Sequence, residues 1–286
     1  ADLAPSTKTL LDGMGDFAAA NPAGRNLHFG IREHAMGAMV NGMALHGGVI
    51  PYGATFFVFA DYMRPALRLA AIMQTHSVFV FTHDSIGVGE DGPTHQPIEQ
   101  LAGLRSIPGL TVLRPADANE TRAAWKLAIE RKKPVALVLT RQKLTTMEES
   151  EYGSADGVPY GAYIVQEAEE KKPQVILLAT GSEVEISIKG AILLEQKGYR
   201  VRVVSMPSWE LFDEQSEQYR QGVLPAGVPV LSVEAGITMG WAKYTGAKGV
   251  SLGIDHFGAS GPGPTVMAKF GFTPENIMAQ ALALLK

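Results

Sequence analysis

Residues 83–97 hold the side chains of this chain that are best suited to chemistry. Asp91 and His95 lie close together in a glycine-punctuated loop, and His83 begins that loop. Carboxylates and imidazoles bind hydroxyl groups, and an imidazole also exchanges protons near neutral pH. Composition alone favours a solvated turn that carries incidental charges.

The elements on either side of this loop indicate where it lies. Residues 76–82 form an apolar run that predicts a buried strand, and a helix is expected to open just after Pro97. Open parallel sheets bind their ligands beyond the carboxyl ends of the strands. The loop is therefore predicted to lie at the ligand-binding edge of a sheet.

Strand and helix patterns alternate along the whole chain, which is typical of parallel sheets covered on both faces. We predict an α/β fold with two mainly parallel-sheet domains, 1–143 and 161–286, joined by a polar, glycine-bearing linker at 144–160. Residues 1–6 are expected to form a loop. The expected helices and strands of both domains are at 32–46, 61–75, 78–81, 110–113, 117–132, 135–139, 175–179, 182–197, 201–205, 230–233 and 275–285.

Composition narrows the class of protein. The chain has 286 residues, a formal net charge of −4 and no cysteine. Disulfides and thiol nucleophiles are therefore excluded, and no histidine–acid set has the spacing of a metal site. Without a basic footprint or an apolar run of membrane length, we expect neither nucleic acid nor a membrane as a partner. A cytoplasmic location fits this composition.

Several other residues have two interpretations from the sequence. Phe56, Phe59 and Tyr62 are spaced to form either a stacking surface for a flat heterocycle or ordinary core. Glu33 begins a predicted helix, where an acid also interacts favourably with the helix dipole. Arg141 follows a predicted strand, and it could be either a phosphate ligand or an ordinary cation on the surface.

Seven strings together make the chain resemble the transketolase family over essentially its whole length, with residues 83–97 as the most specific of them. The resemblance is to the middle, pyrimidine-binding domain and the C-terminal domain of that family. The strings are residues 29–36, 51–56, 83–97, 114–117, 139–142, 179–183 and 255–260.

The resemblance implies thiamine diphosphate as the cofactor, with residues 51–56 in a cofactor-binding loop. It implies that the Glu33 carboxyl hydrogen-bonds to N1′ of the aminopyrimidine and so favours the imino form that activates the cofactor. Phe59 is expected to stack on the pyrimidine, and Phe56 and Tyr62 to line the same pocket. Asp2 is expected to lie near the thiazolium at a subunit interface.

The same resemblance implies a ketose phosphate and an aldose phosphate as substrates, between which a two-carbon ketol unit is transferred in pentose phosphate metabolism. Asp91 is expected to bind a substrate hydroxyl, and His95 the donor carbonyl oxygen or hydroxyl. His83, Arg141 and Ser6 are expected to hold the sugar phosphate. Glu33, Asp91 and His95 are therefore the expected catalytic residues.

The family's N-terminal domain, which binds the diphosphate and its Mg²⁺ or Ca²⁺, has no counterpart in this sequence. We therefore expect a fragment, a cleavage product or one subunit of a split enzyme, inactive without the N-terminal half and working in a homodimer-type assembly. Two alternatives remain open. One is another thiamine enzyme, such as deoxyxylulose-phosphate synthase or a keto-acid dehydrogenase beta subunit, and the other is a non-catalytic regulatory or interaction chain.

Overall fold

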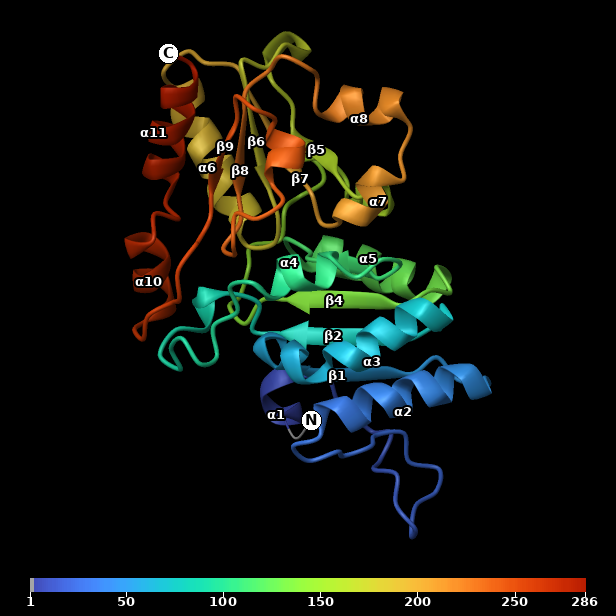
Figure 1. Cartoon of the computed structure of the whole chain (residues 1–286). Helices are drawn as coiled ribbons and strands as arrows, with labels where there is room; N and C mark the ends of the chain where they lie inside the picture. Colours follow the sequence, from blue (N-terminus) through green and yellow to red (C-terminus); the bar gives the residue numbers. More distant parts are fainter. Residues whose placement is uncertain (1–2) are drawn as a thin grey trace.

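The chain folds into two sheets, one in each half (Figure 1), and the computed structural model describes residues 3–286. The first sheet has the order β1-β2-β4-β3 and is parallel throughout. The second has the order β5-β7-β6-β8-β9, with β5 antiparallel to its neighbour. The predicted α/β fold with two mainly parallel sheets is confirmed. The strands are β1 (Tyr52–Phe56), β2 (Val78–Thr82), β3 (Thr111–Leu113), β4 (Val135–Leu139), β5 (Tyr163–Gln166), β6 (Val175–Ala179), β7 (Val201–Ser205), β8 (Val230–Val233) and β9 (Val250–Leu252).

Helices cover both faces of the first sheet because its strands are apolar on both sides. Val78 and Val80 of β2 pack into the core on the α5 side, whereas Phe79 and Phe81 pack into the core formed with α2 and α3. Asp117 caps α5 by accepting a hydrogen bond from the Glu120 amide. The helical segments of this half are α1 (Ala4–Thr7), α2 (Glu33–His46), η1 (Phe57–Phe59), α3 (Ala60–Met73), η2 (Ile86–Val88), α4 (Gln100–Arg105) and α5 (Ala118–Glu130).

The second sheet is built in the same way. Val175 and Leu177 of β6 face the core beneath α6 and α11, and Ile176 and Leu178 face a separate core that contains Trp241. The helical segments here are η3 (Ala155–Tyr160), η4 (Glu169–Lys171), α6 (Glu183–Glu195), α7 (Trp209–Asp213), α8 (Glu217–Val223), α9 (Ala242–Thr245), α10 (Gly263–Lys269) and α11 (Pro274–Leu284).

One hydrophobic core runs through both halves. It contains Val80 and Leu137 of the first sheet together with Leu177 and Leu231 of the second. The connecting segment takes part in this core, because Val158 of η3 is fully buried in it. The two sheets are therefore packed together rather than held by a free tether.

The structure contains β5, β9 and α7 to α10, which were not expected from the sequence, and it differs from three stated expectations. Residues 4–7 form the short helix α1 rather than a loop. Most of the segment expected as a cofactor loop, residues 51–56, is strand β1, which is paired with β2. The helix after Pro97 begins at Gln100, because the Gln100 side chain first accepts a hydrogen bond from the Ile98 amide. Between residues 3 and 286, no helix combines the length and the apolar character needed to cross a membrane.

Candidate functional site

The candidate site lies at the carboxyl edge of the first sheet. Parallel pairing brings the ends of β1, β2 and β4 to the same edge, so Phe56, His83 and Arg141 follow or end neighbouring strands. Helices α2 and α3 begin on this side of the sheet (Figure 1). Glu33, the first residue of α2, is thereby placed on the same side.

An aromatic surface forms the centre of the site. The Phe56 ring stacks on the His83 imidazole with a centroid separation of 3.7 Å and on the Phe59 ring with 6.0 Å. Phe59 in turn stacks on Tyr62 at 5.9 Å. The His95 ring stands edge-on to Phe59 at 5.7 Å. Phe56 is buried and Phe59 is half-buried, whereas Tyr62 is 64% exposed. The exposed part of this aromatic group, Phe59 and Tyr62, therefore offers a flat face to a heterocycle.

His83 lies in a conformation that few non-glycine residues adopt. Its φ of +63° is in the left-handed region, at a cost on the order of 1–3 kcal/mol. Its Nδ1 lies 2.9 Å from the Thr82 hydroxyl. Burial lowers the pKa of His83 and the positive charge of Arg141 lowers it further, against the opposing charges of Asp91 and Asp84. A neutral imidazole is therefore favoured, with the second ring nitrogen left for a ligand.

Glu33 is a buried residue whose carboxyl has no protein partner. Its residue is only 6% exposed. Its side chain has no hydrogen bond or ion pair to any residue between 3 and 286. The carboxyl oxygens are not fully enclosed, so a ligand in the site can reach them and supply the missing partner.

The C-terminal half holds the loop at residues 83–97 in place. The Gln96 amide donates to the carbonyls of Gly89 and Ala259, and the Ser260 hydroxyl donates to the Glu90 carbonyl at 2.6 Å. Gly258 must be small here, because an added Cβ would meet the Gln96 side-chain oxygen at 1.8 Å. The loop is thus shaped by contacts from both halves of the chain.

A cluster of buried charges, which the sequence did not predict, lies behind the loop. Arg114 is fully buried and pairs with Asp84 at 2.8 Å and with Glu183. Burial alone would lower the pKa of Arg114, but the carboxylates of Glu183 and Asp84 raise it, so the guanidinium stays charged. Nearby, Arg105 pairs with Glu234 at 2.7 Å.

This cluster had a signal in the sequence. Asp84, Arg114 and Glu234 each follow the end of an apolar strand closely, within two residues. Charged residues at such positions point to the carboxyl edges of the sheets. Which of these charges pair depends on how the two sheets pack against each other, and the sequence pattern of strands and helices does not predict that packing.

The remaining candidate residues are less closely tied to the site. Asp91 and Arg141 are exposed, and their charges act on His83. Ser6 is exposed on α1, a helix that contacts β1. Asp2 lies outside the described residues. Within residues 3–286, no group of three or more acidic, histidine or cysteine side chains is arranged to bind a metal ion.

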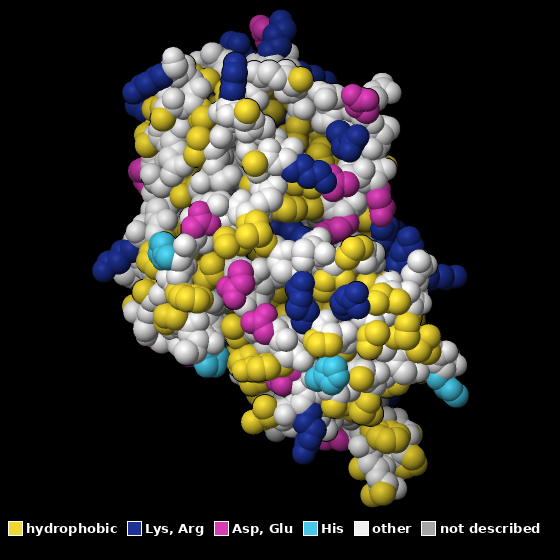
Figure 2. All heavy atoms as spheres, viewed as in Figure 1, with side chains coloured by type: hydrophobic (Ala, Val, Ile, Leu, Met, Phe, Trp, Pro, Cys, Tyr) yellow, Lys and Arg dark blue, Asp and Glu magenta, His cyan; other side chains and the backbone are white. Residues whose placement is uncertain are grey.

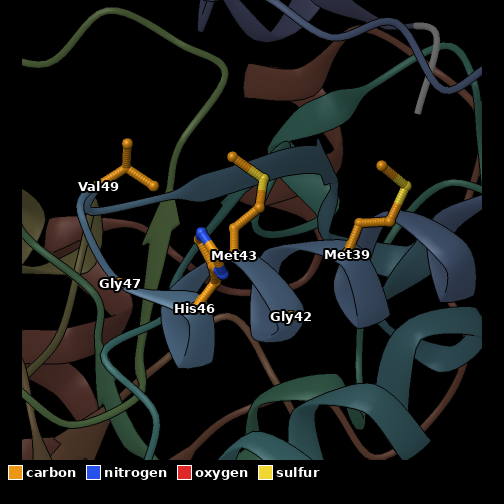
Figure 3. Close-up of a pocket in the computed structure, with 6 residues that line it drawn as sticks. All are labelled: Met39, Gly42, Met43, His46, Gly47 and Val49. Carbon is orange, nitrogen blue, oxygen red and sulfur yellow. The ribbon is translucent and has the colours of Figure 1, made fainter.

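A groove on α2 lies apart from these residues. It encloses about 450 Å³ and is lined mainly by Met39, Met43, His46 and Val49. Figure 3 shows Met39 and Met43 on the same side of the helix. The lining lacks paired polar groups that would orient a small substrate.

Comparison with protein families assigns both halves of the chain. Residues 1–147 match the model described as "Transketolase, pyrimidine binding domain", and residues 161–273 match "Transketolase-like TK C-terminal domain". Transketolase from Aquifex aeolicus is 53% identical over 97% of this chain, and transketolase from Halalkalibacterium halodurans is 54% identical over all of it. The chain spans 40% and 43% of the lengths of these two relatives.

Solved structures give the same result. A transketolase variant from Pichia stipitis superimposes on the whole chain with a TM-score of 0.94 and 44% identity, and the chain covers 42% of it. A split-gene transketolase solved as an inactive β4 tetramer has a TM-score of 0.80 and 26% identity. The chain covers 90% of that split-gene protein.

Proposed function

Because the chain belongs to the transketolase family, we propose that it is the pyrimidine- and substrate-binding part of a transketolase. It would act in the transfer of a two-carbon ketol unit from a ketose phosphate to an aldose phosphate. The main support is the convergence of Phe56, Phe59, His83 and His95 at the edge of the sheet where α2 begins with the unpartnered carboxyl of Glu33. We retain 1–143 and 161–286 as its domains, with 144–160 between them.

The residues present fit the head of thiamine diphosphate. A carboxyl that has no protein partner and can be reached by a ligand suits a hydrogen bond to N1′ of the pyrimidine, and we assign that role to Glu33. Phe59 would stack on the ring, and Phe56 and Tyr62 would line its pocket. When bound, thiamine diphosphate supplies the nucleophilic carbon and the electron sink of the transfer. Glu33 would share the proton at N1′, and we keep Asp2 as a proposed cofactor neighbour.

We assign the sugar phosphate to the neighbouring charges. Arg141 presents an exposed guanidinium beside His83, and together they would bind the phosphate, with Ser6 contributing its exposed hydroxyl. Asp91 would accept a hydrogen bond from a substrate hydroxyl, and its unpaired oxygens would disfavour analogues that lack it. His95, edge-on to the aromatic surface, would bind and protonate the donor oxygen.

The assembly we propose is a homodimer-type complex that includes the amino-terminal, diphosphate-binding half with its Mg²⁺ or Ca²⁺. The chain exposes apolar residues along α2 and α3 that would remain in water without a partner. Figure 2 shows hydrophobic side chains over this part of the molecule. We place the enzyme in the cytoplasm. The exposed residues and the groove on α2 form one candidate interface: Met39, Leu45, Val49, Leu69 and Ile72.

The test is a reconstitution. The chain is mixed with the amino-terminal half of a close transketolase relative, thiamine diphosphate and Mg²⁺. Transfer is then measured with xylulose 5-phosphate and ribose 5-phosphate, and with pyruvate as donor for comparison. We expect transfer from the ketose phosphate by the complex and none by the chain alone. Preference for pyruvate, or turnover by the chain alone, would contradict the proposal.

A second measurement tests cofactor binding without catalysis. Isothermal titration of thiamine diphosphate is expected to show tight binding only when both parts are present. A complex that binds the cofactor without transferring a ketol unit would instead support a non-catalytic chain.

A further inference from the structure

A buried ion pair connects the proposed phosphate-binding residue to the C-terminal half. Nε and Nη2 of Arg114 lie 2.9 and 2.8 Å from the same carboxylate oxygen of Asp84. The opposite side of the guanidinium contacts Glu183 and donates to Thr180, both of which follow β6. Arg114 therefore joins the loop after β2 to the second sheet.

Asp84 is the next residue after His83, so the ion pair acts on the backbone that carries the imidazole. His83 is held at a φ of +63°, which requires restraint from its neighbours. On one side the Thr82 hydroxyl and the Phe56 ring contact the imidazole. On the other side, the anchored carboxylate of Asp84 fixes the following peptide. The position of the imidazole thus depends on both restraints.

We propose that Arg114 is a positioning residue, which holds His83 in place for the sugar phosphate through Asp84 and is itself fixed by Glu183 of the C-terminal half. This inference rests on the proposed function, because it takes His83 as a phosphate ligand. It gives the C-terminal half a role in substrate binding, although its own side chains are not assigned to the substrate.

Stability alone does not account for this arrangement. Burying a charged pair costs as much desolvation free energy as the pairing returns, and well-packed apolar residues stabilise a core at least as well. An ion pair fixes direction, however, since the planar guanidinium holds its partners at defined angles. The location of the pair, directly beside a strained residue of the site, matches a role in orientation.

The test uses Asp84→Ala in the reconstituted two-part enzyme. Arg114 keeps Glu183 as a partner in this variant, so the fold is expected to persist. We expect KM for the ketose phosphate to rise by about tenfold, as for loss of one charge-assisted hydrogen bond. KM and kcat for the corresponding unphosphorylated ketose are expected to stay within about twofold, because we assign His83 and Arg141 to the phosphate alone.

Two further variants separate positioning from folding. Asp84→Asn keeps an oxygen that accepts a hydrogen bond, so it is expected to recover part of the affinity for the ketose phosphate that Asp84→Ala loses. Arg114→Lys keeps the positive charge but lacks the planar guanidinium, so it is expected to raise KM for the phosphorylated donor alone, as Asp84→Ala does. Arg202→Lys is the matched control, since Arg202 is a buried arginine paired with Glu167 away from the loop. Its kinetic constants are expected to match those of the unaltered enzyme.

The outcomes distinguish this inference from the proposed function. Absence of ketol transfer in the unaltered complex would overturn both. The inference alone would be overturned if the unaltered complex transfers the ketol unit but Asp84→Ala and Asp84→Asn change KM for the phosphorylated and unphosphorylated ketoses equally, or change neither. If Asp84→Ala does not fold, the same comparison of KM for the phosphorylated and unphosphorylated ketoses is made with Asp84→Asn and Arg114→Lys, and its result tests the inference.

Discussion

Replacing Glu120 by glutamine is expected to change how the stability of this chain depends on pH. The Glu120 carboxyl is fully buried in α5, where it accepts hydrogen bonds from the Tyr163 and Ser205 hydroxyls at 2.8 and 2.6 Å and from the Ala116 amide. Tyr163 and Ser205 belong to β5 and β7, so the carboxyl bridges the two halves. Burial raises the pKa of Glu120 from 4.5 to about 7.

The sign and size of the effect follow from proton linkage. The pKa of Glu120 is higher in the folded chain than in the unfolded chain. At a pH between these two pKa values, folding is therefore accompanied by uptake of a proton. The stability linked to this proton is complete below pH 4.5 and is lost as pH rises through about 7. A pKa difference of this size corresponds to roughly 3 kcal/mol of unfolding free energy.

The assay is urea unfolding of the unaltered chain and Glu120→Gln across about pH 4.5 to 8. Glutamine keeps the shape and does not ionise, so the stability of the unaltered chain relative to the variant should fall by up to roughly 3 kcal/mol over this range. Comparing the two proteins removes the other titrating groups. Glu195→Gln, at an exposed carboxyl on α6, controls for the substitution itself. Parallel curves for the unaltered chain and Glu120→Gln would refute the reasoning.

Three further results are expected. Glu33→Gln in the reconstituted enzyme should slow proton exchange at C2 of thiamine diphosphate by about 10²–10⁴-fold, measured by NMR, and an unchanged rate would remove Glu33 from its role. Arg141→Met should raise KM for the ketose phosphate by about tenfold or more without changing KM for the unphosphorylated ketose, and steady-state kinetics with both donors checks this. Gly161→Ala should destabilise the chain by more than about 3 kcal/mol in urea unfolding, because φ is +82° and the new Cβ would lie 2.1 Å from the Phe212 nitrogen. The matched Gly227→Ala, with φ of +86° and open space around it, should cost only about 1 kcal/mol, and equal losses would contradict the steric argument.

Much of the fold is predictable from the sequence because local patterns of apolar residues and helix caps determine it. The apolar runs of β2, β4 and β6 mark strands buried on both faces, and Asp117 marks the start of α5. Strand β1 was missed, since Gly53 and its neighbours lack the continuous β-branched pattern that identifies a strand. Its pairing with β2 comes from tertiary packing.

The candidate site was predictable in part. The loop after β2 is identifiable from its chemistry and its place at a strand end, whereas the role of Arg141 after β4 comes from the family resemblance. The structure brings His83 and His95 of the loop onto one aromatic surface. The partners of Arg114 were not predictable, because Asp84 and Glu183 are brought to it from distant positions in the chain. Likewise, the left-handed backbone of His83 depends on contacts that the sequence does not display.

The hydrophobic core that runs through both halves limits how this molecule can move. Many proteins with two sheets in separate domains close around a bound molecule by hinge motion, because little apolar surface joins the two domains. Here Val80, Leu137, Leu177 and Leu231 belong to one cluster, so such opening would expose them to water. Hinge bending within this chain is therefore disfavoured, and we expect access to the proposed sugar-phosphate site to depend on local rearrangement of the loop at 83–97 or on separation from a neighbouring chain.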